Sequence, residues 1–175
     1  KEPLLRGIYA YGFEIPSDIQ KQATIPIIQG KDIIAQAQSG TGKTGSFSIS
    51  TLERIDITQC CTQALILSPT HELVKQTAGV ISDIGRNMDG LKVKTLVGGT
   101  PVREDVVALK YHTPHIVVGT VGRVLDMFQK RHLRGDALKM LIMDEADEML
   151  SQGFSEKIKW LFQNYFTESM QVVLF

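Results

Sequence analysis

Short apolar runs recur along the chain at intervals that suit the strands of one buried sheet. The candidate strands lie at residues 32–35, 64–67, 93–97, 115–118, 140–143 and 171–175. Most are nearly continuous in apolar residues, which is typical of parallel strands buried on both faces. Between them apolar residues recur at helical spacing, first at Leu73, Ala78, Ile81 and Ile84 and later at Ile158, Leu161, Phe162 and Phe166. The alternation predicts an α/β fold, a parallel β-sheet covered by helices on both faces.

Length and composition fit one globular domain. The chain has 175 residues, of which 43% are hydrophobic and 22% charged, and this is ordinary for such a domain. No apolar run approaches the roughly 18 residues of a membrane-spanning helix, so no membrane partner is expected. Lys and Arg together number 19, as do Asp and Glu. This balance argues against capture of nucleic acid by an overall basic field but allows a local binding groove.

The two cysteines, Cys60 and Cys61, are adjacent in the sequence. Neighbouring cysteines are poorly placed to close a loop, and no third cysteine exists. We expect two inert thiols in a reducing, intracellular compartment.

A glycine-rich run follows the first predicted strand. Residues 37–44 read Ala-Gln-Ser-Gly-Thr-Gly-Lys-Thr, which matches the phosphate-binding P-loop except for alanine at its first position. Gly40 and Gly42 allow the backbone to turn its amides toward a phosphate, and the helix expected from about Lys43 adds its N-terminal amides. Lys43 would reach the β and γ phosphates, and the Thr44 hydroxyl would bind Mg²⁺. A plain glycine turn is the alternative, which the flanking strand and helix disfavour.

An acidic segment follows the fifth predicted strand, where Asp144-Glu145-Ala146-Asp147 comes directly after residues 140–143. A carboxylate at the end of a buried strand suits a metal site beside a nucleotide, so Asp144 would hold Mg²⁺. Glu145 would orient or deprotonate the attacking water, and Asp147 would bridge to neighbouring groups. The alternative is an ordinary acidic helix start. The presence of the P-loop favours nucleotide hydrolysis.

These two elements together resemble the DEAD-box RNA helicases, and the resemblance covers essentially the whole chain. Four further segments carry it: the Q motif at 12–20, motif Ia at 69–73, the double glycine at 98–99 and motif Ib at 120–123. It implies a RecA-like P-loop domain that binds ATP and Mg²⁺. The implied nucleotide-binding residues are Gln20, Ser39, Gly40, Thr41, Gly42, Lys43 and Thr44. Thr44 and Asp144 would bind the metal, and Lys43, Asp144 and Glu145 would be the catalytic residues.

The resemblance also implies a site for single-stranded or duplex RNA. Its residues would be Pro69, Thr70, Gly98, Gly99, Thr100, Thr120, Gly122 and Arg123, which would contact phosphates and riboses without regard to base sequence. Taken alone, Gly98-Gly99 would be an ordinary loop. Gln20 would recognise adenine, although Ser17-x-x-Gln20 also has the spacing of a helix capping box.

The chain departs from the family pattern at two positions of the RNA site. His71 stands where the family usually has arginine, and Val121 where it usually has proline. These changes bear on RNA affinity rather than on nucleotide chemistry. Phe13 is the nearest aromatic residue within the Q motif, and we expect it to pack the segment rather than stack on adenine.

Residues 1–175 are expected to form the N-terminal RecA-like ATP-binding domain of a two-domain helicase whose C-terminal domain is absent. Segments 5–13, 35–44 and 144–150 most resemble the branch of the family that acts in translation initiation. That branch implies an RNA-stimulated ATPase when full length, initiation scaffold proteins as partners and a cytoplasmic location. The exon-junction branch, which would be nuclear, stays open. So do a noncatalytic RNA-binding or scaffold protein with the same fold and another P-loop ATPase such as a DNA helicase.

Overall fold

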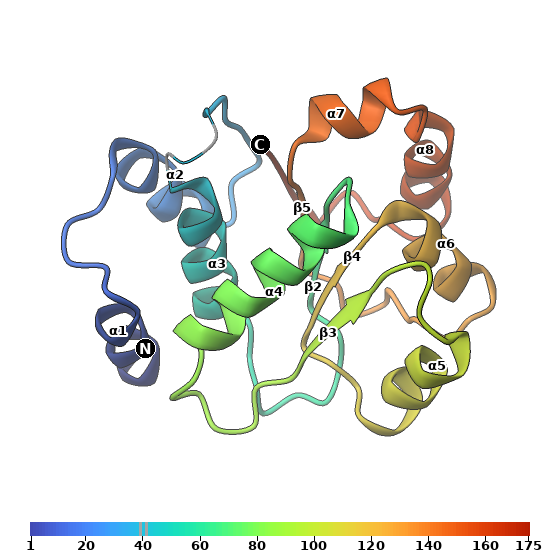
Figure 1. The fold of residues 1–175 in the computed structure, drawn as a ribbon, viewed down its shortest axis with the longest axis horizontal. Coiled ribbons are helices and arrows are strands. Elements are labelled where there is room, and N and C mark those ends of the chain that lie inside the picture. Colours follow the sequence, from blue (N-terminus) through green and yellow to red (C-terminus); the bar gives the residue numbers. More distant parts are fainter. Residues whose placement is uncertain (39, 41) are drawn as a thin grey trace.

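A parallel β-sheet forms the centre of the protein (Figure 1). The computed structural model describes residues 1–38, 40 and 42–175. Within these residues the sheet has six strands in the order β1-β6-β5-β2-β4-β3, and every neighbouring pair is parallel. The strands are β1 (Ile33–Ile34), β2 (Ala64–Leu67), β3 (Val93–Leu96), β4 (Ile116–Gly119), β5 (Met140–Met143) and β6 (Gln171–Leu174).

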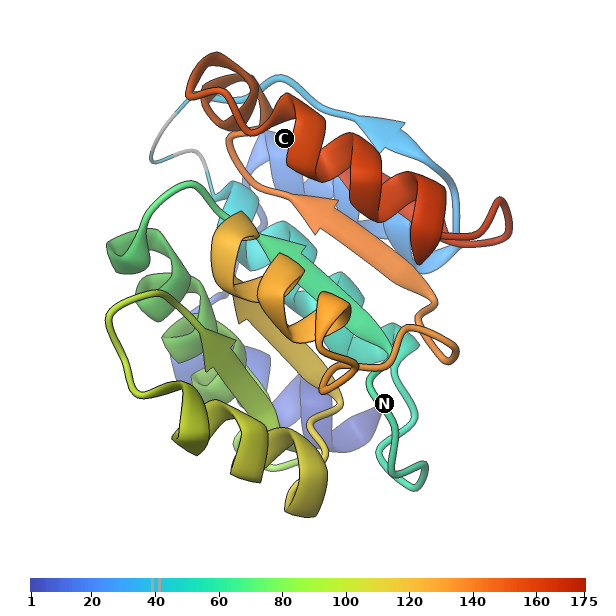
Figure 2. The same ribbon diagram turned by 90° about the vertical axis from the view of Figure 1, so that its right-hand side faces the viewer.

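Helices cover both faces of this sheet, as the sequence predicts. One layer consists of α1 (Glu2–Tyr11), α2 (Asp18–Ile28), α3 (Lys43–Arg54) and α4 (His71–Ile84). The other consists of α5 (Val102–Tyr111), α6 (Val121–Gln129), α7 (Ala146–Ser151) and α8 (Ser155–Asn164), and Figure 2 looks onto this layer. Each layer forms its own hydrophobic core against the sheet.

Every predicted strand is present; 64–67 and 140–143 match residue for residue, and the ends of the others differ by at most one residue. The central strands β2, β4 and β5 are buried along their whole length, which explains their continuous apolar composition. The prediction at 32–35 is too long, because β1 forms only Ile33–Ile34 at a sheet edge, where Ile34 is 86% exposed. The segment 115–118 is shifted by one residue, since β4 spans Ile116–Gly119.

The carboxyl ends of parallel strands meet at one edge of the sheet, and the predicted motifs follow these ends. The phosphate loop follows β1 and the acidic segment follows β5, with β6 between those strands. The predicted RNA segments follow β2, β4 and β3, which form the other half of the sheet. The fold therefore places nucleotide and RNA candidates side by side along one edge. Across the described residues, no helix has the length and apolar character to span a membrane.

Candidate nucleotide and RNA sites

The phosphate loop has the backbone that its glycines predict. Gly40 and Gly42 have φ values of 81° and 90°, in the left-handed region that favours glycine. Helix α3 begins directly afterwards at Lys43, so the free N–H groups of its first turn lie at the loop. Ser39 and Thr41, also predicted to bind the nucleotide, lie outside the described residues. The described part of the loop is suited to hold an anion at a helix N-terminus.

Lys43 lies against the acidic segment that follows β5. Its Nζ is 3.2 Å from Oδ1 of Asp144 and 3.7 Å from Oε1 of Glu145. The Asp144 side chain is 2% exposed and that of Lys43 13%. The fold thus brings together the three residues that the sequence analysis assigned to one site, although Lys43 and Asp144 are 101 positions apart (144 − 43 = 101).

The sheet fixes the acidic segment through its backbone. The Asp144 amide donates to the carbonyl of Leu67 at 2.9 Å, and the Ala146 amide donates to the carbonyl of Phe175 at 3.0 Å. Between them Glu145 has a φ of 52°, which is uncommon for a residue with a side chain. Strained backbone of this kind is often retained at functional sites. Asp147 is exposed in the first turn of α7, and its bridging role stays a prediction.

Burial and neighbouring carboxylates shift the pKa values of Asp144 and Glu148. Burial raises the pKa of Asp144, and the nearby Lys43 ammonium opposes that rise. A hydrogen bond with Glu145 raises the pKa of Glu148, with smaller contributions from burial and from the charges of Glu145 and Asp147. Negative charge is therefore concentrated beside the phosphate loop, and a cation at Asp144 would stabilise it.

Gln20 joins the Q motif to the phosphate loop. The capping box at the start of α2 is present, because the Ser17 amide donates to Gln20 Oε1 at 2.9 Å and Ser17 Oγ accepts from the Gln20 amide at 3.4 Å. Gln20 Nε2 also donates to the carbonyl of Gly42 at 3.2 Å. The capping role is confirmed, while adenine recognition stays a prediction. Phe13 packs against the core near Gly45, as expected.

The predicted RNA residues line up at the ends of β2, β3 and β4. Thr70 caps α4, and its hydroxyl accepts from the Leu73 amide at 3.2 Å. Gly99 has a φ of 85°. The imidazole of His71 lies close to Gly98 and Gly99. A Cβ atom added to Gly98 would lie 3.8 Å from the ring, and one added to Gly99 would lie 4.0 Å from it. The departure at position 71 thus lies inside this candidate site.

Arg123 holds two of these segments together from within. Its guanidinium donates to Asp105 Oδ2 at 2.5 Å and to the carbonyl of Thr100 at 3.0 Å, and its side chain is 9% exposed. Lys94 Nζ lies 3.0 Å from the other Asp105 oxygen. Arg123 therefore links the double-glycine loop to α6, and its contact with RNA stays a prediction. Sequence reasoning missed Asp105, since an acid in the first turn of a helix is ordinary.

Val121, the second departure, is the first residue of α6 and is 1% exposed. Proline at this helix position would be compatible with the same backbone. Valine instead fills a buried position of the core between β4 and α6.

Comparisons with known proteins agree with this arrangement. The family described as DEAD/DEAH box helicase matches residues 17–175. The ATP-dependent RNA helicases eIF4A of Aspergillus clavatus and Neurospora crassa are 58% and 55% identical over 174 residues. The match covers 99% of this chain and 43% of each relative. The chain thus spans less than half the length of these relatives.

Solved structures show the same likeness. S. cerevisiae Dbp5 bound to RNA and ADP BeF3 superposes with a TM-score of 0.87 at 32% identity, covering 100% of this chain and 44% of that one. A hypothetical ATP-dependent RNA helicase from Sulfolobus tokodaii gives a TM-score of 0.86 at 32% identity, with 99% of this chain and 49% of the other covered.

Proposed function

Because the chain belongs to the DEAD/DEAH box helicase family, we propose that it is the N-terminal RecA-like, ATP-binding domain of an RNA helicase of the eIF4A type. The observation that carries this proposal is the convergence of Lys43 with Asp144 and Glu145 at the carboxyl edge of the sheet. The identity with eIF4A relatives of two fungi supports the initiation-factor branch. We propose RNA-stimulated ATP hydrolysis as the activity of the full-length protein.

The residues present fit a magnesium ion with a nucleotide. Asp144 Oδ1 is buried and accepts no hydrogen bond from the described residues, and the Lys43 ammonium lies 3.2 Å from it. Thr44, one position into α3, adds a hydroxyl. One carboxylate and one hydroxyl beside phosphates are the protein ligands that Mg²⁺ commonly uses. Bound there, the metal would neutralise charge on the phosphate oxygens during transfer.

The chain's own residues have distinct tasks around this nucleotide. Lys43 would exchange its contact with Asp144 for the β and γ phosphates, because a phosphate brings more negative charge than one carboxylate. Glu145, held by the Ala146 and Asp144 backbone bonds, would orient the attacking water. Gln20 would recognise adenine while it keeps the Gly42 carbonyl in place. A second domain would complete the site with further cations.

RNA would bind along the ends of β2, β4 and β3 through threonine hydroxyls and glycine amides. Pro69, Thr70, Gly98, Gly99, Thr120, Gly122 and Arg123 are the proposed contacts. Backbone contacts of this kind do not distinguish bases. A net charge of zero is compatible with such local binding.

We propose the partners and the location from the same branch. The names of the relatives support the eIF4A branch, and for that branch we propose translation-initiation scaffold proteins as partners and the cytoplasm as the location. The exon-junction branch would instead place the protein in the nucleus. Among the solved structures, S. cerevisiae Dbp5 is bound to Gle1 in one and to both Nup159 and Gle1 in another.

The proposal is tested by joining this chain to the remaining sequence of the Aspergillus clavatus relative and measuring ATP hydrolysis with and without poly-uridine RNA. We expect RNA to raise turnover, and we expect Lys43→Ala to abolish it. Lys31→Ala, at an exposed lysine before β1, is the matched control and should hydrolyse ATP normally. A folded fusion that binds RNA but shows no RNA-stimulated turnover would instead favour the noncatalytic alternative.

A further inference from the structure

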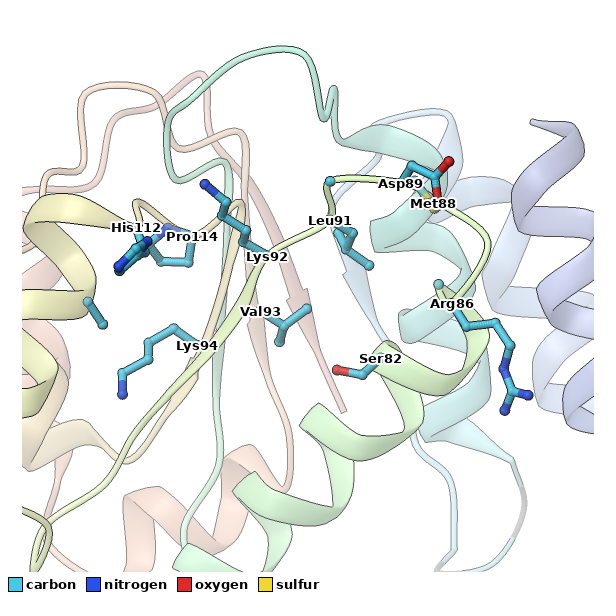
Figure 3. A pocket seen from close by; sticks show the side chains of 13 residues that line it. Ser82, Arg86, Met88, Asp89, Leu91, Lys92, Val93, Lys94, His112 and Pro114 are labelled. Atoms are coloured by element: carbon cyan, nitrogen blue, oxygen red, sulfur yellow. The ribbon is translucent and has the colours of Figure 1, made fainter.

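The edge strand β3 lies in an open groove of about 680 Å³ on the side of the sheet opposite β1 (Figure 3). We call this hollow the β3 groove. Its walls are the end of α4 with the loop that follows it and the end of α5, and β3 itself forms the floor. The residues that line the groove include Ser82, Arg86, Lys92, Val93, Lys94 and His112. None of them belongs to the proposed nucleotide or RNA sites.

The outer backbone groups of β3 face this groove. On the inner side, the carbonyls of Lys92 and Leu96 accept from β4 and its flanking residues, from the amides of Ile116 and Thr120. Backbone groups alternate in direction along a parallel strand, so those of Val93 and Thr95 point outward. Among the described residues β3 is the last strand of the sheet. The N–H and C=O groups of Val93 and Thr95, which pair with no other strand among the described residues, are therefore available to an added strand.

The side chains around β3 divide the groove into an apolar side and a basic side. In Figure 3 Val93 points toward α4 and Ser82, whereas Lys92 and Lys94 point toward His112 on the α5 side. Val93 is half-buried against the core beneath α4. A strand laid beside β3 would present alternate residues to these two sides. The groove thus fits a segment in which apolar and charged residues alternate.

Charge decides which segment fits. Arg86, Lys92 and Lys94 line the groove as cations, and Asp89 is the acid among its lining residues. Arg86 and Lys92 are exposed and make no ion pair among the described residues, while Lys94 pairs with Asp105. Lysines on an edge strand discourage pairing with a second copy of the same chain, because like charges would face each other. They leave the edge open to an acidic strand.

We propose that the β3 groove binds an extended acidic segment of a partner protein, which adds to the sheet as a strand beside β3. The main-chain bonds to Val93 and Thr95 hold the segment. Alternating acidic side chains meet Lys92 and Lys94, and the intervening apolar side chains pack on the α4 side near Val93. This surface is separate from the nucleotide site, so Lys43→Ala leaves it intact.

The test uses the 175-residue chain labelled with ¹⁵N and a short synthetic peptide of alternating glutamate and valine. We expect chemical-shift changes and slower amide exchange at Val93 and Thr95. Methylating the alternate peptide nitrogens that would face β3 should weaken binding about tenfold or more, because those donors are lost. A peptide of the same composition with its valines and glutamates in separate blocks should also bind more weakly.

Two charge-reversed variants supply the matched comparison. Lys92→Glu should weaken peptide binding by about tenfold, while Lys159→Glu, at an exposed position of α8, should leave it unchanged. Thermal melting confirms that both variants fold. Three results would overturn the proposal: no binding of the peptide, equal binding of its methylated form, or displacement of the peptide by poly-uridine RNA from the same amides. The last would make the groove a polyanion site.

Discussion

Replacing Asp105 with asparagine should destabilise the domain much more than its position on α5 would indicate. Asp105 is a carboxylate with a side chain 3% exposed between two cations, Lys94 at 3.0 Å and Arg123 at 2.5 Å. Asparagine keeps the volume but leaves both cations without their counter-charge. Removing one partner of a buried ion pair costs about 3–5 kcal/mol.

The expected loss is smaller here, because the Lys94 side chain is 26% exposed and remains partly solvated. Arg123 also keeps its bonds to Thr100. We therefore expect Asp105→Asn to lower the free energy of unfolding by about 2–3 kcal/mol. At about 2–4 °C per kcal/mol for a domain of this size, the melting temperature should fall by about 4–12 °C.

The assay is urea and thermal denaturation beside Asp126→Asn. Asp126 lies on α6 and pairs with Lys130 at 3.1 Å, but that pair is exposed and spans one helical turn. Its loss should cost about 0.5 kcal/mol or less. If the two variants lose the same stability, the buried Asp105 cluster does not hold the double-glycine loop to α6 as described.

Three further predictions concern other parts of the molecule. His115 is 3% exposed, and burial lowers its pKa below the ordinary value of 6.5, so the unfolded chain takes up a proton that the folded chain excludes. The free energy of unfolding should therefore fall as the pH drops below 6.5, and the same pH dependence in urea titrations of His115→Gln would contradict this. Gly45→Ala should lower the free energy of unfolding by about 1–3 kcal/mol, because the added methyl group would lie 2.9 Å from the Phe13 ring. Gly79→Ala, whose methyl group would have no neighbour within 4 Å, should raise it by about 0.5–1 kcal/mol, and equal effects of the two variants in denaturation would show that the Q-motif segment does not pack tightly on α3. Without nucleotide, Asp144→Asn should melt at or above the wild-type temperature, because burial disfavours the ionised carboxylate. Mg²⁺ and ADP should raise its melting temperature much less than that of the wild type, and an unchanged rise would exclude Asp144 from the metal site.

The sequence predicts the sheet well because its central strands are buried on both faces. Short, continuous apolar runs such as 64–67 and 140–143 have few possible structures other than a buried strand, and both form strands at those residues. The Lys43 and Asp144 pair was predictable for a related reason. Each residue follows a predicted strand, and the carboxyl ends of parallel strands share one edge.

Other features depend on strand order and side-chain contacts that local patterns do not contain. Nothing in the segment around Asp105 distinguishes a buried carboxylate from an exposed one, and its partners are 11 and 18 positions away in the sequence (105 − 94 = 11, 123 − 105 = 18). The edge position of β3 had one available signal, since polar Lys94 and Thr95 interrupt its apolar run. Polar residues inside a strand are typical of an edge with solvent on one side.

Isothermal titration of the chain with Mg²⁺ and ADP measures whether Lys43 and Asp144 form one nucleotide site at the carboxyl edge of the sheet. We predict that ADP binds, that Lys43→Ala binds at least about tenfold more weakly, and that Lys31→Ala binds as the wild type does. Equal affinity of wild type and Lys43→Ala, with both proteins folded, would show that Lys43 is not part of a nucleotide site.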